Sequence, residues 1–281
     1  MAILMDGKAL AEQRRAELKN AVEAYKSTAQ RTPCLNVVLV GEDSASELYV
    51  KNKIKMAEVV GIQSKVERLH AECAQEDVLQ RVDALNEDPC VDGILVQLPL
   101  PKAINADKVI AQIAADKDVD GLTPVSLGNL IRGIDGVRPC TPRGILTLLD
   151  HYEIALEGKE VVIVGRSSLV GKPMALMLLE RDATVKVCHS RTQDLAEVVG
   201  EADLLICAIG QPEFIRPEWL KKGVSVVDVG ITKTPKGWVG DVCAEGIREK
   251  VSAWTPVPGG VGPMTVISLL ENTLELAAHK K

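Results

Sequence analysis

A tyrosine and a lysine stand four residues apart in the polar stretch SELYVKNK, residues 46–53. If this stretch is helical, residues four apart share one face, so Tyr49 and Lys53 can touch. A phenol beside an amine could act as an acid–base pair, and the same spacing also fits an ordinary helix surface. The pair is therefore a candidate for proton transfer that the remaining sequence has to support or dismiss.

Three further stretches combine polar side chains or dense turn residues with the ends of apolar runs: GILVQLPLP (93–101), KDVDGLTP (117–124) and PVPGGVGPMT (256–265). The first ends an apolar strand on Gln97, and the second offers Asp118 and Asp120 beside a glycine. The third is so rich in Pro and Gly that its backbone must turn sharply or approach another group closely. A strand end, a turn capped by Asp and a rigid turn between domains are the structural alternatives. Because ligands bind at strand ends in open α/β domains, function is favoured for Gln97.

A possible nucleotide-binding turn opens the second half of the chain, in KEVVIVGRSSLVGKPMALMLLE. A hydrophobic strand runs into Gly165, a short loop follows, and an apolar-periodic helix begins at Gly171. This arrangement presents backbone N–H groups to phosphate. It departs from the G-x-G-x-x-G pattern, because Ser167 replaces the second glycine and the outer glycines lie farther apart. A tight strand-to-helix turn without a nucleotide is therefore the alternative.

The end of the next strand indicates which cofactor such a turn would hold. In NAD-binding folds an acidic residue at this point binds the ribose 2′-hydroxyl. Here the strand ends in CHSRT, without a carboxylate, and Ser190 and Arg191 are suitable partners for a 2′-phosphate. Arg166 supplies a second cation. The pattern predicts NADP rather than NAD, with a solvated loop as the alternative.

The elements that must position these residues alternate between helix and strand. The first half predicts a helix over 9–26 capped by Asp6, strands at 34–40, 64–69 and 93–97, and helices ending at Gly61 and covering 76–86 and 106–114. After a stretch at 118–142 with no clear regular structure, the second half predicts helices at 143–153, from Gly171 and over 261–280, and strands at 160–165, 184–190, 203–210 and 224–230. Such alternation is typical of open α/β domains.

We therefore expect an α/β protein of two open domains with a cleft between them. Residues 1–140, joined by the C-terminal helix 262–281, form the first expected domain. Residues 141–261 form the expected Rossmann-like, NADP-binding domain.

Composition narrows the class of protein. With 281 residues, 46% hydrophobic and 26% charged, the chain should fold as a soluble protein with a substantial core. A net charge of −6 argues against nucleic acid as a partner. No apolar run is long enough for a signal peptide or a membrane span. Seven singly spaced Cys and four His suggest neither a disulfide framework nor a metal site. Cys188 and Cys207 lie in apolar runs and are expected to be buried free thiols in a reducing cytoplasm.

Taken together, the motifs resemble one family. The chain resembles the bifunctional methylenetetrahydrofolate dehydrogenase/cyclohydrolase of one-carbon metabolism, in seven stretches that follow the family's order: ASELYVKNK, GILVQLPLP, KDVDGLTP, CTPRGI, VVIVGRSSLVGKP, CHSRT and PVPGGVGPMT. The resemblance implies NADP-dependent oxidation of 5,10-methylenetetrahydrofolate and hydrolysis of the product to 10-formyltetrahydrofolate. It also implies a cytoplasmic homodimer that serves tetrahydrofolate interconversion and purine biosynthesis, without nucleic acid, membrane or metal.

The resemblance assigns roles to individual residues. Lys53 corresponds to the catalytic lysine, Tyr49 to a tyrosine that stacks near the pterin, and Gln97 to a glutamine that contacts the lysine. Asp120 corresponds to an aspartate that hydrogen-bonds the pterin ring. The other implied substrate contacts are Val96, Leu98, Pro258, Gly259, Gly260, Val261 and Gly262. The implied cofactor contacts are Gly165, Arg166, Ser167, Ser190, Arg191 and Ile231, with Ile231 near the nicotinamide.

The two reactions ask different things of these side chains. Hydride leaves a carbon flanked by two nitrogens that stabilise the resulting cation, so this step needs mainly orientation. Hydration of the methenyl cation requires proton movement, and an ordinary lysine is protonated at neutral pH and a poor base. Neighbouring cations, desolvation and a cationic substrate all favour the neutral amine. We therefore expect Lys53 to act as base or proton shuttle, tuned by Gln97 and Tyr49.

Three rival hypotheses fit less well. Short-chain dehydrogenases also use Tyr-x-x-x-Lys, but there the pair follows the glycine-rich turn, whereas Tyr49 and Lys53 precede Gly165. An NAD-dependent enzyme of the same family, assisted by Mg²⁺ and phosphate, fits poorly with Ser190 and Arg191 and with the lack of a transit-like leader. A nucleotide-sensing protein with an inactive site would not be expected to have all four of the expected catalytic residues, Tyr49, Lys53, Gln97 and Asp120.

Overall fold

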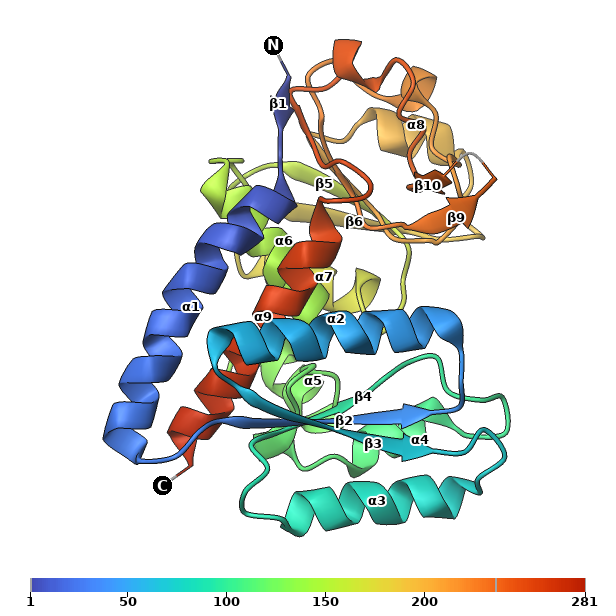
Figure 1. Ribbon diagram of the computed structural model, residues 1–281. Helices are drawn as coiled ribbons and strands as arrows, with labels where there is room; N and C mark the ends of the chain where they lie inside the picture. The colour runs from blue at the N-terminus through green and yellow to red at the C-terminus, as the bar shows by residue number, and fades with distance from the viewer. Residues whose placement is uncertain (1, 236, 281) are drawn as a thin grey trace. The chain divides into compact units, whose positions relative to one another are not determined.

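The computed structural model describes residues 2–235 and 237–280, and the chain forms two compact units (Figure 1). Unit 1 comprises Met1–Glu12 and Thr141–Thr265, and unit 2 comprises Gln13–Cys140 and Val266–Lys281. Each unit is built on a parallel sheet, as the alternation of helices and strands predicted.

The sheet of unit 2 has the strand order β3-β2-β4 in the part of the chain that the structure describes. The central strand β2 (Cys34–Val40) pairs in parallel with β3 (Gln63–Leu69) on one side and β4 (Gly93–Val96) on the other. Every residue of β2 is buried, which explains its continuous apolar run. Helix α2 (Ser44–Val60) covers one face of this sheet and α3 (Gln75–Glu87) the other (Figure 1).

Helix α2 begins and ends at residues that favour those positions. The Asp43 carboxylate accepts a hydrogen bond of 2.8 Å from the backbone N–H of Ser46 and so caps the first turn. Gly61 ends the helix with φ 85°, and its N–H bonds back to Ala57 O and Glu58 O. The predicted helix is confirmed, and it places Tyr49 and Lys53 on successive turns.

The other helices of unit 2 follow the predicted pattern with one addition. They are α4 (Ala106–Gln112), the 3₁₀ turn η1 (Ala115–Lys117), α5 (Pro124–Ile131), and most of α1 (Gly7–Ala29) and α9 (Val261–His279), both of which begin in unit 1. Asp6 caps α1, since its Oδ1 accepts from the N–H of Ala9 at 3.0 Å. Helix α5 lies inside the stretch where no regular structure was expected. Thr123 caps it and Pro124 starts it, but its apolar pattern is too short to identify a helix from the sequence.

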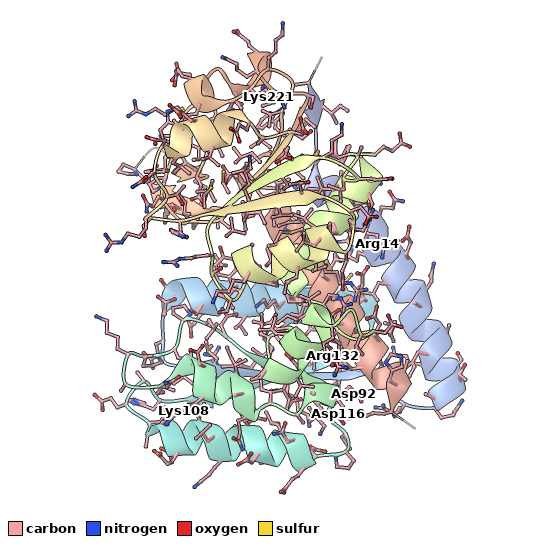
Figure 2. The ribbon with its side chains drawn as sticks, turned by 180° about the vertical axis from the view of Figure 1, so that it is seen from behind. Arg14, Asp92, Lys108, Asp116, Arg132 and Lys221 are labelled. Atoms are coloured by element: carbon pink, nitrogen blue, oxygen red, sulfur yellow. The ribbon has the colours of Figure 1, made fainter. Side chains whose placement is uncertain are left out.

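A fully buried carboxylate, Asp92, ties together the ends of three elements of unit 2. It accepts from Arg31 at 2.8 Å, from the N–H of Cys34 at 2.9 Å, and lies 3.3 Å from the Lys280 ammonium (labelled Asp92 in Figure 2). Arg31 also donates to Ala277 O, near the end of α9. The end of α1, the start of β2 and the end of α9 are thereby fixed to one another.

The sheet of unit 1 is parallel throughout and has the order β1-β11-β8-β7-β5-β6 among the described residues. Its strands are β1 (Ile3–Leu4), β5 (Glu160–Val164), β6 (Thr184–Cys188), β7 (Leu204–Cys207), β8 (Ser225–Asp228) and β11 (Ala253–Trp254). The four predicted strands are confirmed, whereas β1 and β11, of two residues each, were not expected. The chain passes from β5 to β6 and then returns to the other side of β5 as β7. In doubly wound sheets, nucleotides bind at the carboxyl ends of the strands beside such a reversal.

Helices and a small hairpin complete unit 1. They are α6 (Cys140–His151), α7 (Gly171–Leu179), α8 (Leu195–Gly200), η2 (Pro217–Trp219), η3 (Ile247–Glu249), and β9 (Thr232–Thr234) paired with β10 (Gly237–Val239). Cys188 and Cys207 are buried free thiols, as predicted. Burial raises the pKa of Cys207 well above its ordinary value, so this thiol stays neutral. None of the described helices combines the length and hydrophobicity that a bilayer crossing needs.

Candidate functional site

Lys53 and Gln97 meet at the carboxyl end of β4. The Lys53 ammonium donates to Gln97 Oε1 at 3.0 Å, although the two residues come from different elements of unit 2. Gln97 is only 8% exposed, and its Nε2 donates to Leu98 O at 2.6 Å. Because the amide nitrogen is occupied in this way, the oxygen is the atom that faces Lys53. The hydrogen bond to Gln97 therefore fixes the orientation of the Lys53 side chain.

Tyr49 lies one helical turn before Lys53 on α2. Residues at this spacing share a helix face, and the Tyr49 side chain is 42% exposed. Its ring is therefore accessible to a flat ligand that approaches Lys53. The position fits the stacking role expected for this tyrosine.

Asp120 is the electrostatic neighbour of Lys53 in the same unit. Burial raises the pKa of the Asp120 carboxyl and the nearby Asp118 raises it further, whereas the charge of Lys53 lowers it. The Cys140 thiol contacts Asp120, and burial raises the pKa of Cys140 well above its ordinary value. Cys140 was not among the predicted site residues, although the stretch CTPRGI that contains it had been noticed. The neutral thiol donates to Val119 O at 3.2 Å and accepts from Asn272 Nδ2 at 3.4 Å, so we do not assign it proton chemistry.

The structure separates the two aspartates of the stretch KDVDGLTP. Asp118 is fully buried and accepts three hydrogen bonds, from Gly121 N at 2.9 Å, Thr123 N at 2.8 Å and Ser126 Oγ at 2.7 Å. These bonds shape the loop between η1 and α5. Asp118 therefore holds the backbone that carries Asp120 and has no capacity left for a ligand at its bonded positions.

Lys117 anchors the same loop from the other side. Its buried ammonium donates to three carbonyl oxygens at the end of α3, those of Leu85 at 2.8 Å, Asn86 at 2.6 Å and Asp88 at 2.7 Å. Lysine at the C-terminus of a helix satisfies carbonyls that lack partners within the helix. The Lys of this motif is thus a structural cap.

The predicted contacts Val96 and Leu98 line a small pocket of unit 2. Asp120 lines it as well, and the remaining lining residues are Ile94, Ile110, Ile113, Asp118 and Leu122. These side chains therefore lie together in unit 2, although the pocket itself is too small to hold a ring.

The segment from Pro258 to Gly262 belongs to unit 1, and it makes the close approach that its composition predicted. A Cβ placed on Gly7 would lie 1.8 Å from Gly260 O, and the N–H of Lys8 donates to Gly259 O at 2.8 Å. Gly259 has φ 106°, which favours glycine. The segment therefore packs its backbone onto the start of α1, where only a residue without a side chain fits.

The turn after β5 is built so that two backbone segments touch. A Cβ at Gly165 would lie 2.3 Å from Ala208 O, and one at Gly171 would lie 2.1 Å from Gly165 O. Ser167 closes the loop, since its Oγ accepts from the N–H of Val170 at 3.1 Å. Arg166 and Ser167 are exposed beside this turn. The close backbone contacts fix the shape of the turn, and the N–H groups where the turn enters the helix at Gly171 form a cradle that fits a bound phosphate group.

The turn after β6 lies next to that cradle. The N–H of Gly165 donates to Cys188 O at 2.9 Å, which brings the ends of β5 and β6 together. Ser190 and Arg191 follow on an exposed turn that His189 stabilises by accepting from the N–H of Arg191 at 3.1 Å. The predicted hydroxyl and cation therefore stand beside the glycine turn, with no carboxylate at the end of β6.

Ile231 follows β8 and is 44% exposed, so it is accessible at the carboxyl ends of the strands. Two buried carboxylates lie near Ile231. Asp228 ends β8 and accepts from the N–H of Gly230, and Asp241 packs against Gly230. Sequence reasoning did not single out either one. Burial, and to a smaller extent the charge of Asp241, raises the pKa of Asp228 to about 7. The hydrogen bonds from the N–H groups of Val242 and Asp241 lower this pKa but do not offset the effect of burial.

This raised pKa predicts how folding stability changes with pH. The folded chain holds the Asp228 proton more tightly than the unfolded chain, whose carboxyl titrates near 3.8. The contribution is therefore complete below about pH 4 and is lost as the pH rises towards 7, by about 4 kcal/mol at most. Urea denaturation of the wild type and of Asp228→Asn across this range should show the decline only in the wild type.

Asp203 supplies a control of the opposite sign for that experiment. The hydrogen bond from Lys221 lowers the pKa of Asp203, so its contribution to stability is present above the unfolded pKa and is lost as the pH falls. The variant Asp203→Asn should flatten the acid side of the curve only. Parallel curves for the wild type and Asp228→Asn would contradict the prediction.

Comparison with known proteins agrees with this geometry. Residues 5–120 match the family model described as "Tetrahydrofolate dehydrogenase/cyclohydrolase, catalytic domain". Residues 139–281 match "Tetrahydrofolate dehydrogenase/cyclohydrolase, NAD(P)-binding domain". The two models together cover most of the chain.

Curated relatives and solved structures extend the likeness over the full length. The bifunctional protein FolD of Moorella thermoacetica is 51% identical over 277 residues, 98% of this chain and 99% of the relative. The crystal structure of the bifunctional FolD from Campylobacter jejuni has a TM-score of 0.97 and 47% identity, and the match covers 100% of each chain. The Trypanosoma brucei FolD, solved with NADP and an inhibitor, has a TM-score of 0.95 and 37% identity, covering 100% of this chain and 99% of that one.

Proposed function

Because the chain belongs to the tetrahydrofolate dehydrogenase/cyclohydrolase family, we propose that it catalyses both reactions for which the family is named. It oxidises 5,10-methylenetetrahydrofolate to the methenyl form with NADP⁺, and it hydrolyses the methenyl form to 10-formyltetrahydrofolate. The observation that carries the proposal is the hydrogen bond from Lys53 to Gln97 at the carboxyl end of β4.

Unit 2 supplies the side chains for the hydrolytic step. Gln97, fixed by its own bond to Leu98 O, directs the Lys53 amine. Lys53 moves the proton as water adds to the methenyl carbon, which is general acid–base work. Tyr49 stacks on the pterin, and the Asp120 carboxyl accepts hydrogen bonds from the donors of the pterin ring. Val96 and Leu98 are the further folate contacts of unit 2.

Unit 1 supplies the cofactor site, and its residues fit NADP. When bound there, NADP⁺ would supply the hydride acceptor. Gly165, Arg166 and Ser167 hold the pyrophosphate at the turn that leads into α7, because backbone N–H groups at the start of a helix bind phosphate. Ser190 and Arg191 bind the 2′-phosphate, and the lack of a carboxylate at the end of β6 removes the usual partner of a free ribose 2′-hydroxyl. The NADP-bound relative from Trypanosoma brucei supports this choice.

The proposal also includes the bounds of the two domains, the oligomeric state of the protein and its location. The folate-binding domain comprises residues 1–140 with the helix 262–281, and the NADP-binding domain comprises residues 141–261. The protein works as a homodimer in the cytoplasm, and no metal, nucleic acid or membrane takes part.

A spectrophotometric assay of the purified protein tests the proposal. The protein is given 5,10-methylenetetrahydrofolate with NADP⁺ or, in parallel, with NAD⁺. We expect reduction of NADP⁺, followed by decay of the methenyl absorbance faster than in buffer. Turnover with NAD⁺ alone would overturn the cofactor assignment, and binding of both ligands without turnover would indicate a nucleotide-sensing protein.

A further inference from the structure

Two buried carboxylates of unit 1 have no part in the proposed chemistry. Asp228 is 5% exposed and Asp241 is fully buried. Asp228 ends β8, and Asp241 follows the β9–β10 hairpin. Buried carboxylates are costly unless hydrogen bonds hold them, so the contacts of these two indicate what they stabilise.

Asp241 bonds the loop that follows β7. Its Oδ2 accepts from the N–H of Ile209 at 2.7 Å and from that of Gly210 at 3.1 Å. This loop lies at the reversal of strand order, where Ala208 O packs against Gly165. The carboxylate therefore sets the conformation of one wall of the crevice that receives the nucleotide.

Asp228 in turn holds Asp241. Its Oδ1 accepts from the N–H of Asp241 at 2.9 Å and from that of Gly230 at 3.1 Å, and its Oδ2 accepts from Val242 N at 2.9 Å. One carboxylate thus fixes the backbone of the second and the first residues after β8. Asp228, Asp241 and the loop after β7 form a continuous chain of contacts.

Steric contacts show that the loop after β8 rests on this pair. A Cβ at Gly230 would lie 2.2 Å from Asp241 Oδ1, and a Cβ at Gly240 would lie 1.9 Å from Asp228 Oδ2. Asp241 Oδ1 itself is buried and has no hydrogen-bond partner among the described residues. A buried acceptor left unpaired lowers stability. The contacts of Asp241 therefore fit a geometric role for the side chain rather than a contribution to stability.

We propose that Asp241, held by Asp228, is a positioning residue for hydride transfer. It fixes the loop 208–210 after β7 and the loop 229–231 after β8, on which the nicotinamide half of the cofactor lies. The inference rests on the proposed function, because it assumes that Ile231 borders the nicotinamide. The adenosine end is held elsewhere, by Ser190 and Arg191.

The variant Asp241→Ala should separate the two activities. It leaves the N–H groups of Ile209 and Gly210 unpaired, so the nicotinamide loses its alignment. We expect the dehydrogenase kcat to fall by about 10- to 100-fold, while the KM for NADP⁺ changes little. A kinetic isotope effect with the dideuterated methylene substrate should rise, and the cyclohydrolase rate should stay within about twofold of wild type.

Two variants bracket this result. Asp241→Asn keeps an oxygen that can accept from both N–H groups and should recover most of the dehydrogenase kcat. Asp203→Ala is the matched control, because Asp203 accepts from Glu160 N at 3.1 Å and from Lys221 at 2.6 Å at the amino ends of the strands (Lys221 is labelled in Figure 2). It should lower the melting temperature and leave both activities unchanged.

The inference would be overturned if Asp241→Ala kept the wild-type dehydrogenase kcat. It would also be overturned if Asp241→Ala and Asp203→Ala each lost the two activities to the same extent. If Asp241→Ala does not fold, Gly230→Ala displaces the same carboxylate and should give the same separation of activities. Fluorescence of bound NADPH decides the matter even in a protein without turnover. The emission change on binding should be lost in Asp241→Ala while the affinity for 2′,5′-ADP is kept, and retention of the change would refute the positioning role.

Discussion

Replacement of Lys53 by Met should abolish hydrolysis of methenyltetrahydrofolate, with a loss of about 10²- to 10⁴-fold that reaches the rate in buffer. Methionine keeps the length of the side chain but cannot move a proton, and it leaves Gln97 Oε1 without its donor. Hydride transfer needs orientation rather than proton transfer, so the dehydrogenase rate should fall by less than about tenfold. The measurement is the decay of methenyl absorbance beside reduction of NADP⁺ in the same preparation.

Lys55→Met is the matched control for this variant. Lys55 is exposed on the same helix, α2, and its replacement should leave both rates unchanged. Near-identical melting temperatures of the two variants would show that α2 stays folded. A Lys53→Met protein that still hydrolysed the methenyl substrate at the wild-type rate would refute the assignment of Lys53.

The double variant Ser190→Ala/Arg191→Ala should change the cofactor preference. Charge-assisted hydrogen bonds to a phosphate contribute about 1.5–3 kcal/mol each. Their loss should lower kcat/KM for NADP⁺ by about 10²-fold, mainly through KM, and leave kcat/KM for NAD⁺ within about twofold. Steady-state kinetics with each nucleotide at saturating folate give both ratios.

Lys222→Ala controls for a general change in surface charge. Lys222 is an exposed cation of unit 1 in the turn before β8, at the amino ends of the strands, away from the glycine turn. Its removal should leave the ratio of the two nucleotides unchanged. If kcat/KM fell equally for NADP⁺ and NAD⁺ in the double variant, the 2′-phosphate would have to bind at other residues. The proposed folate chemistry would not be affected.

The secondary structure near the site could be predicted because its signals are local. The apolar run of β2, the cap at Asp43 and the stop at Gly61 each act over a few neighbouring residues, and the structure confirms all three. The spacing of Tyr49 and Lys53 needed only the helical period. The role of Lys53 was different, because it came from the resemblance of whole stretches and not from spacing.

Elements that depend on distant partners could not be predicted. Strands β1 and β11 have two residues each, too few for a pattern, and they exist because Ile3 and Leu4 pair with Ala253 and Trp254. Helix α5 is short and lay in a stretch rich in Gly, where its cap at Thr123 is a weak signal alone. Backbone pairing across the chain is a tertiary property that composition does not encode.

The two aspartates of KDVDGLTP show the same division within the site. The order and period of the residues were enough to place a lysine on a helix, and a glutamine and carboxylates after elements of an α/β fold. Tertiary contacts alone show that Asp118 is occupied by three hydrogen bonds while Asp120 lies beside Lys53, and that Asp228 and Asp241 hold the loops after β8 and β7. The physical reason is that hydrogen-bond partners and burial belong to three-dimensional neighbours, and these lie far apart along the chain.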